Sequence, residues 1–209
     1  MKKIFSLIFI LFFSTLSVFS ADMRIIQVDG ALYSKVNSTK FEKLIEKINK
    51  AKDVEFVIFT GNNIAKPDPN LLKDFIKLTN KIKAPCYFVL GQKDVNIKKN
   101  LSKNKYISIL KKYARSHKKI KESNYVIAKK GIVFIIADGS KEVIPTPIGY
   151  YREDVILWLD EKLDDYKDKN VIFILAESFD EAAIEPNLTP TLNALFFQSV
   201  SFWAAFLFW

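Results

Sequence analysis

The chain has 209 residues, of which 49% are hydrophobic, and this is enough apolar material for one domain with its own core. Its 32 basic side chains outnumber 23 acidic ones and give a net charge of +9. The lysines are scattered over predicted helices, so we expect a solvated basic surface and no nucleic-acid partner. The single cysteine, Cys86, excludes an internal disulfide, and we expect it to be a small buried side chain.

The amino-terminal segment is typical of a secretory signal peptide. Lys2 and Lys3 precede an apolar run over residues 4–19, and Val18 and Ser20 favour cleavage after Ser20. We therefore predict that residues 1–20 are a signal peptide and that the protein is exported to a periplasmic or extracellular location. An uncleaved anchor is the alternative, although the run is short for a bilayer span.

Strand-like and helix-like segments alternate along the rest of the chain. The apolar runs 23–28, 54–60, 87–90 and 170–176 are typical of strands, and 124–139 is typical of a hairpin that turns at residues 129–131. Helices are predicted after Thr39, which forms a capping box with Glu42, and over residues 71–79, 102–119 and 152–166. Continuous apolar strands alternating with helices predict a sheet covered on both faces, and hence a layered α/β fold.

Polar turns, most of them containing glycine, follow the predicted strands directly. They are residues 29–31, 61–63, 91–94 and 176–178. In sheets of this kind, ligands bind beyond the carboxyl ends of the strands. We therefore expect any functional site to be built from these turns.

Three stretches resemble the calcineurin-like metallophosphoesterases, over residues 23–180. They are FTGNNI at 59–64, APCYFVLGQKDV at 84–95 and GYYREDVILWLDEKL at 149–163. The family carries D-x-H, G-D, G-N-H-D, a further His and G-H-x-H, and these residues hold two divalent metal ions that bind phosphate and activate a hydroxide. The resemblance implies a layered α/β sandwich of the metallophosphoesterase type, incomplete at the carboxyl terminus, and a phosphate-containing ligand.

The sequence departs from the family's pattern at most of the metal-binding positions. Asp29 matches the first Asp, but Ala31 replaces the His two residues on, and Asn62 replaces the Asp that bridges the two ions. In the third motif, Gln92 and Lys93 replace Asn and His. An amide in place of a carboxylate removes charge from the site, and the Lys93 ammonium would repel a nearby cation.

The remaining motif positions are also altered. Lys93 and Asp94 occupy the family's catalytic motif, Glu177 stands where the family has a His, and no G-H-x-H follows. A dinuclear site needs several imidazoles and carboxylates, and the chain has a single histidine, His117. His117 lies outside every motif in a lysine-rich stretch, so we expect it to be a surface residue.

We therefore interpret the chain as an exported phosphoesterase homologue that has lost most metal ligands and is catalytically inactive. No cofactor is expected, although the family would imply two divalent metal ions. The vestigial metal positions are Asp29, Asn62, Gln92 and Glu177.

Other interpretations of these turns stay open. The polar turn 92–94 could simply cap itself through its own side chains. Lys93 and Asn62 could form a phosphate pocket with exposed main-chain N–H groups. Asp29, Gln92 and Glu177 could hold a single metal ion, which would make the protein a weak phosphohydrolase with an altered site.

Residues 188–209 form an apolar tail without a charged side chain, separate from the predicted domain at 21–187. The tail could be a packed terminal segment, a membrane contact through residues 192–209, or the out-of-frame end of a truncated gene. A membrane contact would favour a tethered, non-enzymatic binding protein. A truncated domain would expose a sheet edge and tend to aggregate.

Overall fold

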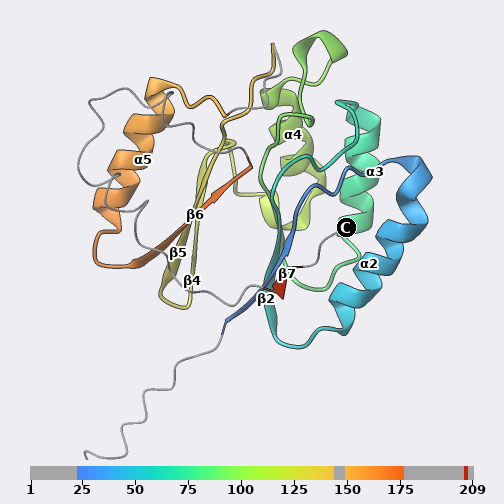
Figure 1. The fold of residues 1–209 in the computed structure, drawn as a ribbon, viewed down its shortest axis with the longest axis horizontal. Coiled ribbons are helices and arrows are strands. Elements are labelled where there is room, and N and C mark those ends of the chain that lie inside the picture. Colours follow the sequence, from blue (N-terminus) through green and yellow to red (C-terminus); the bar gives the residue numbers. More distant parts are fainter. Residues whose placement is uncertain (1–22, 144–148, 177–204, 207–209) are drawn as a thin grey trace, which may run out of the picture.

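The computed structural model describes residues 23–143, 149–176 and 205–206, and it shows a mixed α/β protein (Figure 1). The predicted signal peptide, Glu177 and nearly all of the apolar tail lie outside these residues. Within the described ranges, every helix is too short or too polar to cross a lipid bilayer.

The first sheet is parallel and has the order β3-β2-β1-β7. Its strands are β1 (Arg24–Val28), β2 (Val54–Phe59), β3 (Cys86–Phe88) and β7 (Ala205–Phe206). The register pairs Val28 with Phe59 and Phe59 with Phe88. Parallel neighbours need crossovers, and α2 (Ser38–Lys50) and α3 (Pro69–Thr79) supply them.

The predicted helical periodicity is confirmed by the packing of these helices. The apolar side chains of α2 and α3, together with those of α4 (Lys103–Tyr113), form one core against the first sheet. Phe59 on β2 lies at its centre, with ring centroids 5.3 Å from Phe75 in edge contact and 5.3 Å from Phe88 in a stacked contact. Asp68 begins α3 by accepting hydrogen bonds from the N–H groups of Asn70 and Leu71.

The second sheet has three strands in the order β4-β5-β6. They are β4 (Tyr125–Lys129), β5 (Ile132–Ala137) and β6 (Asn170–Leu175), with α5 (Glu153–Asp165) before β6. The predicted hairpin is confirmed, because β4 and β5 are antiparallel and turn at Lys130 and Gly131, both with positive φ. Strand β6 then pairs with β5 in parallel.

The expectation of a single sheet covered by helices on both faces was wrong. Alternate β5 residues divide between two cores: Phe134 and Ile136 pack against the first sheet, whereas Val133 and Ile135 pack against α5. The layers therefore run α2, α3 and α4, then the first sheet, the second sheet, and α5 (Figure 1). Strands β2 and β5 are apolar on both faces, as the sequence predicts, but one face of each is covered by the other sheet.

The outer edge of β3 explains why the strands divide. The N–H groups of Cys86 and Phe88 donate to Ser116 Oγ at 3.0 Å and to His117 Nε2 at 3.1 Å. Tyr125 Oη donates to the Phe88 carbonyl oxygen at 3.0 Å. These side chains occupy the groups that another strand would need, so β4 cannot extend the first sheet.

The prediction that His117 is a surface residue was also wrong. It lies in the short helix η3 (Arg115–His117), is 1% exposed, and packs its ring against Phe88 and Tyr125. Burial lowers the pKa of its imidazole from 6.5 to about 3. The lysine-rich neighbours point to solvent while the histidine points inward. Cys86 is buried, as predicted, and burial raises the pKa of its thiol to about 12.

The predicted capping box of Thr39 and Glu42 is not formed. The chain turns earlier, through the short helix η1 (Lys35–Asn37), and α2 begins at Ser38 with Thr39 already inside its first turn. The Ser34 N–H donates to Asn37 Oδ1 at 2.8 Å. The Asn37 side chain therefore closes the turn of η1, which leads directly into α2.

Candidate functional site

Strand ends from both sheets meet at one edge of the molecule, which is uppermost in Figure 1. Apart from Thr79 and His117, the buried polar side chains of the described residues all follow the carboxyl end of β2, β3 or β5. They are Thr60, Asn63, Gln92, Asp94, Asp138 and Ser140. Burying a polar group is unfavourable unless the group is hydrogen-bonded. We therefore expect the buried polar side chains at this edge to be hydrogen-bonded to one another or to the main chain.

Two glycines allow the turns at this edge to touch. A Cβ atom on Gly91 would lie 2.2 Å from the Asn62 nitrogen, and one on Gly61 would lie 2.4 Å from Ala176 Cβ. Gly61 also has φ of +98°, which favours glycine. The turn after β1 joins the same group, because the Leu32 N–H donates to the Asn62 carbonyl at 2.8 Å. Main chain therefore fills much of the space between the strand ends.

Asp94 is fully buried and ties the turns after β2 and β3 together. Its Oδ1 accepts from the Ile64 N–H at 3.0 Å, and its Oδ2 accepts from the Gly91 N–H at 2.9 Å and Asn63 Nδ2 at 3.0 Å. Burial raises the pKa of this carboxyl from 3.8 to about 7, and the hydrogen bonds from Ile64, Gly91 and Asn63 oppose that rise. All three donors belong to the two turns themselves, so Asp94 holds these turns together. We call a side chain with this role a structural joint.

Asn63 extends the same joint into the helical layer. Its Nδ2 contacts the Val89 carbonyl oxygen at 2.8 Å and Tyr106 Oη at 3.1 Å, besides Asp94. Its Oδ1 is buried and has no hydrogen-bond partner among the described residues. Tyr106 is fully buried on α4, and burial with the nearby Asp94 raises the pKa of its phenol well above the usual value.

Of the vestigial metal positions, the structure describes Asp29, Asn62 and Gln92, which follow neighbouring strands and have side-chain oxygens with partners within the protein. Asp29 is exposed, and its Oδ1 accepts from Thr60 Oγ1 at 2.9 Å. Asn62 has φ of +48°, and its Oδ1 accepts from the Lys93 N–H at 3.0 Å. The Lys93 side chain is exposed, and Ala31 is buried where the family has a histidine.

Gln92 binds a segment from the second sheet. Its Oε1 accepts from the Lys141 N–H at 2.8 Å, and its Nε2 donates to the Lys141 carbonyl oxygen. This reciprocal pair joins the turn after β3 to the loop after β5. The interpretation of residues 92–94 as a self-capping turn was therefore only partly right, because Gln92 takes its partner from a distant segment and Asp94 takes two of its donors from the β2 turn.

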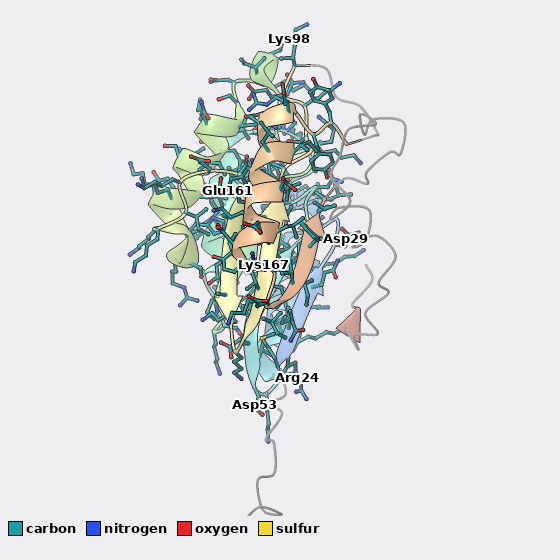
Figure 2. The ribbon with its side chains drawn as sticks, turned by 90° about the vertical axis from the view of Figure 1, so that its left-hand side faces the viewer. Arg24, Asp29, Asp53, Lys98, Glu161 and Lys167 are labelled. Atoms are coloured by element: carbon teal, nitrogen blue, oxygen red, sulfur yellow. The ribbon has the colours of Figure 1, made fainter. Side chains whose placement is uncertain are left out.

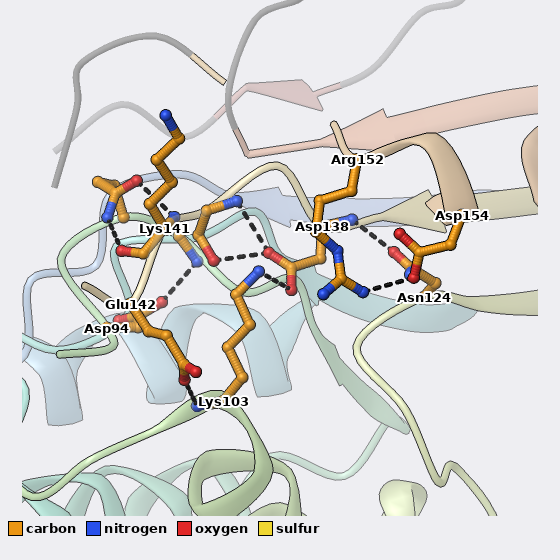
Figure 3. Close-up of polar contacts among 11 residues, drawn as sticks. Asp94, Lys103, Asn124, Asp138, Lys141, Glu142, Arg152 and Asp154 are labelled. Carbon is orange, nitrogen blue, oxygen red and sulfur yellow. Dashed lines mark hydrogen bonds and ion pairs between the residues drawn. The ribbon is translucent and has the colours of Figure 1, made fainter. Parts of the chain in front are cut away.

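A second polar cluster at the same edge was missed by the sequence analysis (Figure 3). Lys103 Nζ lies 2.8 Å from Asp138 Oδ2, and the Ser140 N–H and Oγ donate to Asp138 Oδ1 at 2.9 and 2.6 Å. The Asp138 N–H donates to Asn124 Oδ1 at 2.8 Å. A signal was present, since VFIIADG ends in Asp138-Gly139 just as RIIQVDG ends in Asp29-Gly30. Treating 124–139 only as a hairpin concealed it.

The residues at this edge do not fit two divalent metal ions. Nowhere in the described part of the chain do three His, Cys, Asp or Glu side chains gather as a metal-binding group. The carboxylates in the described motif turns are Asp29, whose Oδ1 accepts from Thr60, and Asp94, which is fully buried and accepts three hydrogen bonds from the protein. Glu177, the remaining vestigial position, lies outside the described residues.

The fold and this edge define a mixed α/β protein whose strand ends are joined by internal hydrogen bonds. A scan against protein-family models gives no match, and a search of curated proteins gives none either.

Proposed function

We propose that the protein is an exported, catalytically inactive homologue of the calcineurin-like metallophosphoesterases, in which the former metal-binding turns serve as structural joints. The observation that carries the proposal is the use of the motif side chains. Asn62, Gln92 and Asp94 direct their oxygens at main-chain N–H groups of Lys93, Lys141 and Ile64. Each of these oxygens therefore uses a lone pair on a donor of the protein, and Asp94 is also fully buried.

The arrangement of the motifs supports the resemblance to the family. Asp29, Asn62 and residues 92–94 follow β1, β2 and β3, which are adjacent and parallel in the first sheet. The turns therefore come together at one edge, where the family's ligands would also have to meet. The layered α/β sandwich of the metallophosphoesterase type belongs to this proposal, as does export, which rests on the amino-terminal sequence.

The chemistry of the edge argues against hydrolysis. Metal-assisted attack on a phosphate ester needs ions that generate a hydroxide and stabilise the leaving oxygen. Asn62 is a neutral amide where the family holds its bridging anion, Lys93 stands where the family has an imidazole, and Asp94 has no access to solvent. The competing proposal of a weak phosphohydrolase would require a metal on Asp29 and Gln92, yet the oxygen and the nitrogen of the Gln92 side-chain amide both bind Lys141.

The test measures metal binding and turnover on the same preparation. We expect equilibrium dialysis to leave no tightly bound manganese or zinc, and hydrolysis of bis(4-nitrophenyl) phosphate to stay at the buffer rate with or without added Mn²⁺. Turnover that needs Mn²⁺, disappears in Asp29→Asn and persists in the matched surface variant Asp168→Asn would overturn the proposal in favour of the weak phosphohydrolase.

A further inference from the structure

The outermost part of the strand-end edge carries exposed apolar side chains. Ile97, in the short helix η2 (Ile97–Lys99), is 51% exposed, Val143 is 55% exposed and Tyr150 is 48% exposed. They are held in one place, because the Ile97 N–H donates to the Glu142 carbonyl at 2.9 Å and the Tyr150 N–H donates to the Gly139 carbonyl at 2.8 Å. We call Ile97–Lys99, residues 141–143 and Tyr150 the tip.

Lysines surround these apolar side chains. Lys98 and Lys99 follow Ile97 directly, and Lys141 Nζ lies 4.1 Å from the centroid of the Tyr150 ring. Figure 2 shows Lys98 at the extreme end of the molecule, opposite Arg24 and Asp53. The acidic side chain of the tip, Glu142, is turned inward and accepts from the Lys103 N–H at 2.6 Å. The surface that the tip presents is therefore positive.

The sequence around Ile97 supplies no acidic side chain that could neutralise the lysines of the tip. Residues 95–121 contain no Asp or Glu, so no acid from η2, α4 or η3 neutralises the lysines. One hollow among the described residues is lined mainly by α3 and α4, and none of its lining residues belongs to the tip. The tip projects from the fold and carries separate apolar side chains between lysines (Figure 2).

Protruding apolar side chains beside lysines match the chemistry of an anionic lipid surface. Lysines are attracted to acidic headgroups, and aliphatic and aromatic side chains gain free energy when they enter the boundary between headgroups and acyl chains. We propose that the tip docks on a membrane surface rich in anionic lipid, with Ile97 and Val143 inserted and Lys98, Lys99 and Lys141 at the headgroups. This proposal is independent of the proposed function and does not involve residues 192–209.

Vesicle binding by the full chain tests the proposal. We expect the protein to sediment with phosphatidylcholine vesicles that contain phosphatidylglycerol, and the partition coefficient to fall about tenfold in Ile97→Ser/Val143→Ser. Lys98→Gln/Lys99→Gln should also cost about tenfold. The matched controls are Leu157→Ser, at an apolar residue 63% exposed on α5, and Lys118→Gln/Lys119→Gln, at two exposed lysines beyond η3. Tip variants that sediment like their controls would refute the proposal.

A local probe separates the tip from any other membrane contact of the chain. Cys86 is buried and its thiol pKa is raised to about 12, so an environment-sensitive dye will label an introduced surface cysteine selectively. In Ile97→Cys, we expect dye emission to rise severalfold and shift to the blue when phosphatidylglycerol vesicles are added. In Leu157→Cys, emission should stay unchanged. Binding without a response at position 97 means that another part of the chain docks, and the proposal fails.

Discussion

The main-chain N–H of Phe88 donates a hydrogen bond to Nε2 of His117 at 3.1 Å, across the open edge of the first sheet. An imidazole that accepts at Nε2 is neutral and carries its proton on Nδ1, which is buried without a hydrogen-bond partner among the described residues. The only histidine of the chain therefore caps the sheet edge: its ring nitrogen accepts the main-chain hydrogen bond that a further strand would otherwise take.

Replacing this cap should destabilise the protein and expose the sheet edge. We expect His117→Ala to lower the free energy of unfolding by about 3 kcal/mol, because the Phe88 N–H loses its acceptor and the ring leaves a cavity. Denaturant unfolding measures the loss, and hydrogen exchange at the Phe88 amide should speed up selectively. Lys118→Ala, one residue away and exposed, should match the parent in both measurements. Equal exchange in the two variants would mean that the bond does not protect the edge.

The buried imidazole of His117 should make the free energy of unfolding rise with pH between about 3 and 6.5. Its pKa is about 3 when folded and 6.5 ordinarily, so between these values the unfolded chain binds more protons. This contribution to stability is present above pH 6.5 and is lost as the pH falls through the folded pKa, and the total loss is about 5 kcal/mol. In His117→Gln, whose amide oxygen can still accept from Phe88, this loss should be absent.

Asp94 should give the opposite slope. Its folded pKa of about 7 lies above the ordinary 3.8, so the folded chain binds more protons in this window. Its contribution is full below pH 3.8 and is lost as the pH rises through 7. Between pH 4 and 6.5 the two slopes oppose each other in the parent protein. We expect stability to rise with pH in Asp94→Asn and to fall with pH in His117→Gln, as measured by urea titrations across that range; slopes of the same sign would contradict both assignments.

The ion pair of Lys103 with Asp138 should matter more than the surface pairs. The Asp138 side chain is 2% exposed, so Lys103→Ala leaves a buried carboxylate without its cation, and we expect a loss of about 3 kcal/mol in the free energy of unfolding. Lys81→Ala breaks a pair whose side chains are 55% and 49% exposed. We expect its free energy of unfolding to equal that of the parent protein. A similar small effect for both variants would show that solvent reaches Asp138.

The contact between the turns after β2 and β3 predicts a strong effect of one methyl group. Gly91→Ala would place a Cβ 2.2 Å from the Asn62 nitrogen, and the main chain there cannot yield without breaking the Asp94 hydrogen bonds. We expect a loss of at least about 3 kcal/mol, or failure to fold. Gly30→Ala is the control: it has positive φ but open space, so backbone strain alone should cost about 1 kcal/mol.

Local periodicity predicted most elements of this fold, and it failed where distant segments decide the outcome. The buried side chains of α2 and α3 lie at the predicted spacing, and β1, β2, β5 and β6 follow apolar runs. A strand that is apolar on both faces looks the same whether a helix or a sheet covers it, so the division into two sheets could not be predicted. His117 looked exposed because its sequence neighbours are lysines, and only the position of β3 shows otherwise.

For the candidate site, the positions of the turns could be predicted from the sequence, but the partners of their side chains could not. The sequence placed Asp29, Asn62 and Gln92 after successive strands, and the structure brings those turns together. Their partners come from far along the chain: Gln92 binds Lys141 and Asp94 binds Ile64. Contacts across such separations depend on the assembled sheets, and a motif in one segment carries no information about them.

The four residues Gly91–Asp94 differ sharply in how much substitution the fold can absorb. Gly91 is fixed by contact with Asn62, Gln92 by its reciprocal pair with Lys141, and Asp94 by its three donors. Lys93 contributes a main-chain N–H and points its side chain to solvent. A library randomised over these positions and selected for folding alone should therefore diversify at 93 and return the parent residue at the other three. Position 93 is the one place in this turn where a side chain can change without disturbing a contact described above.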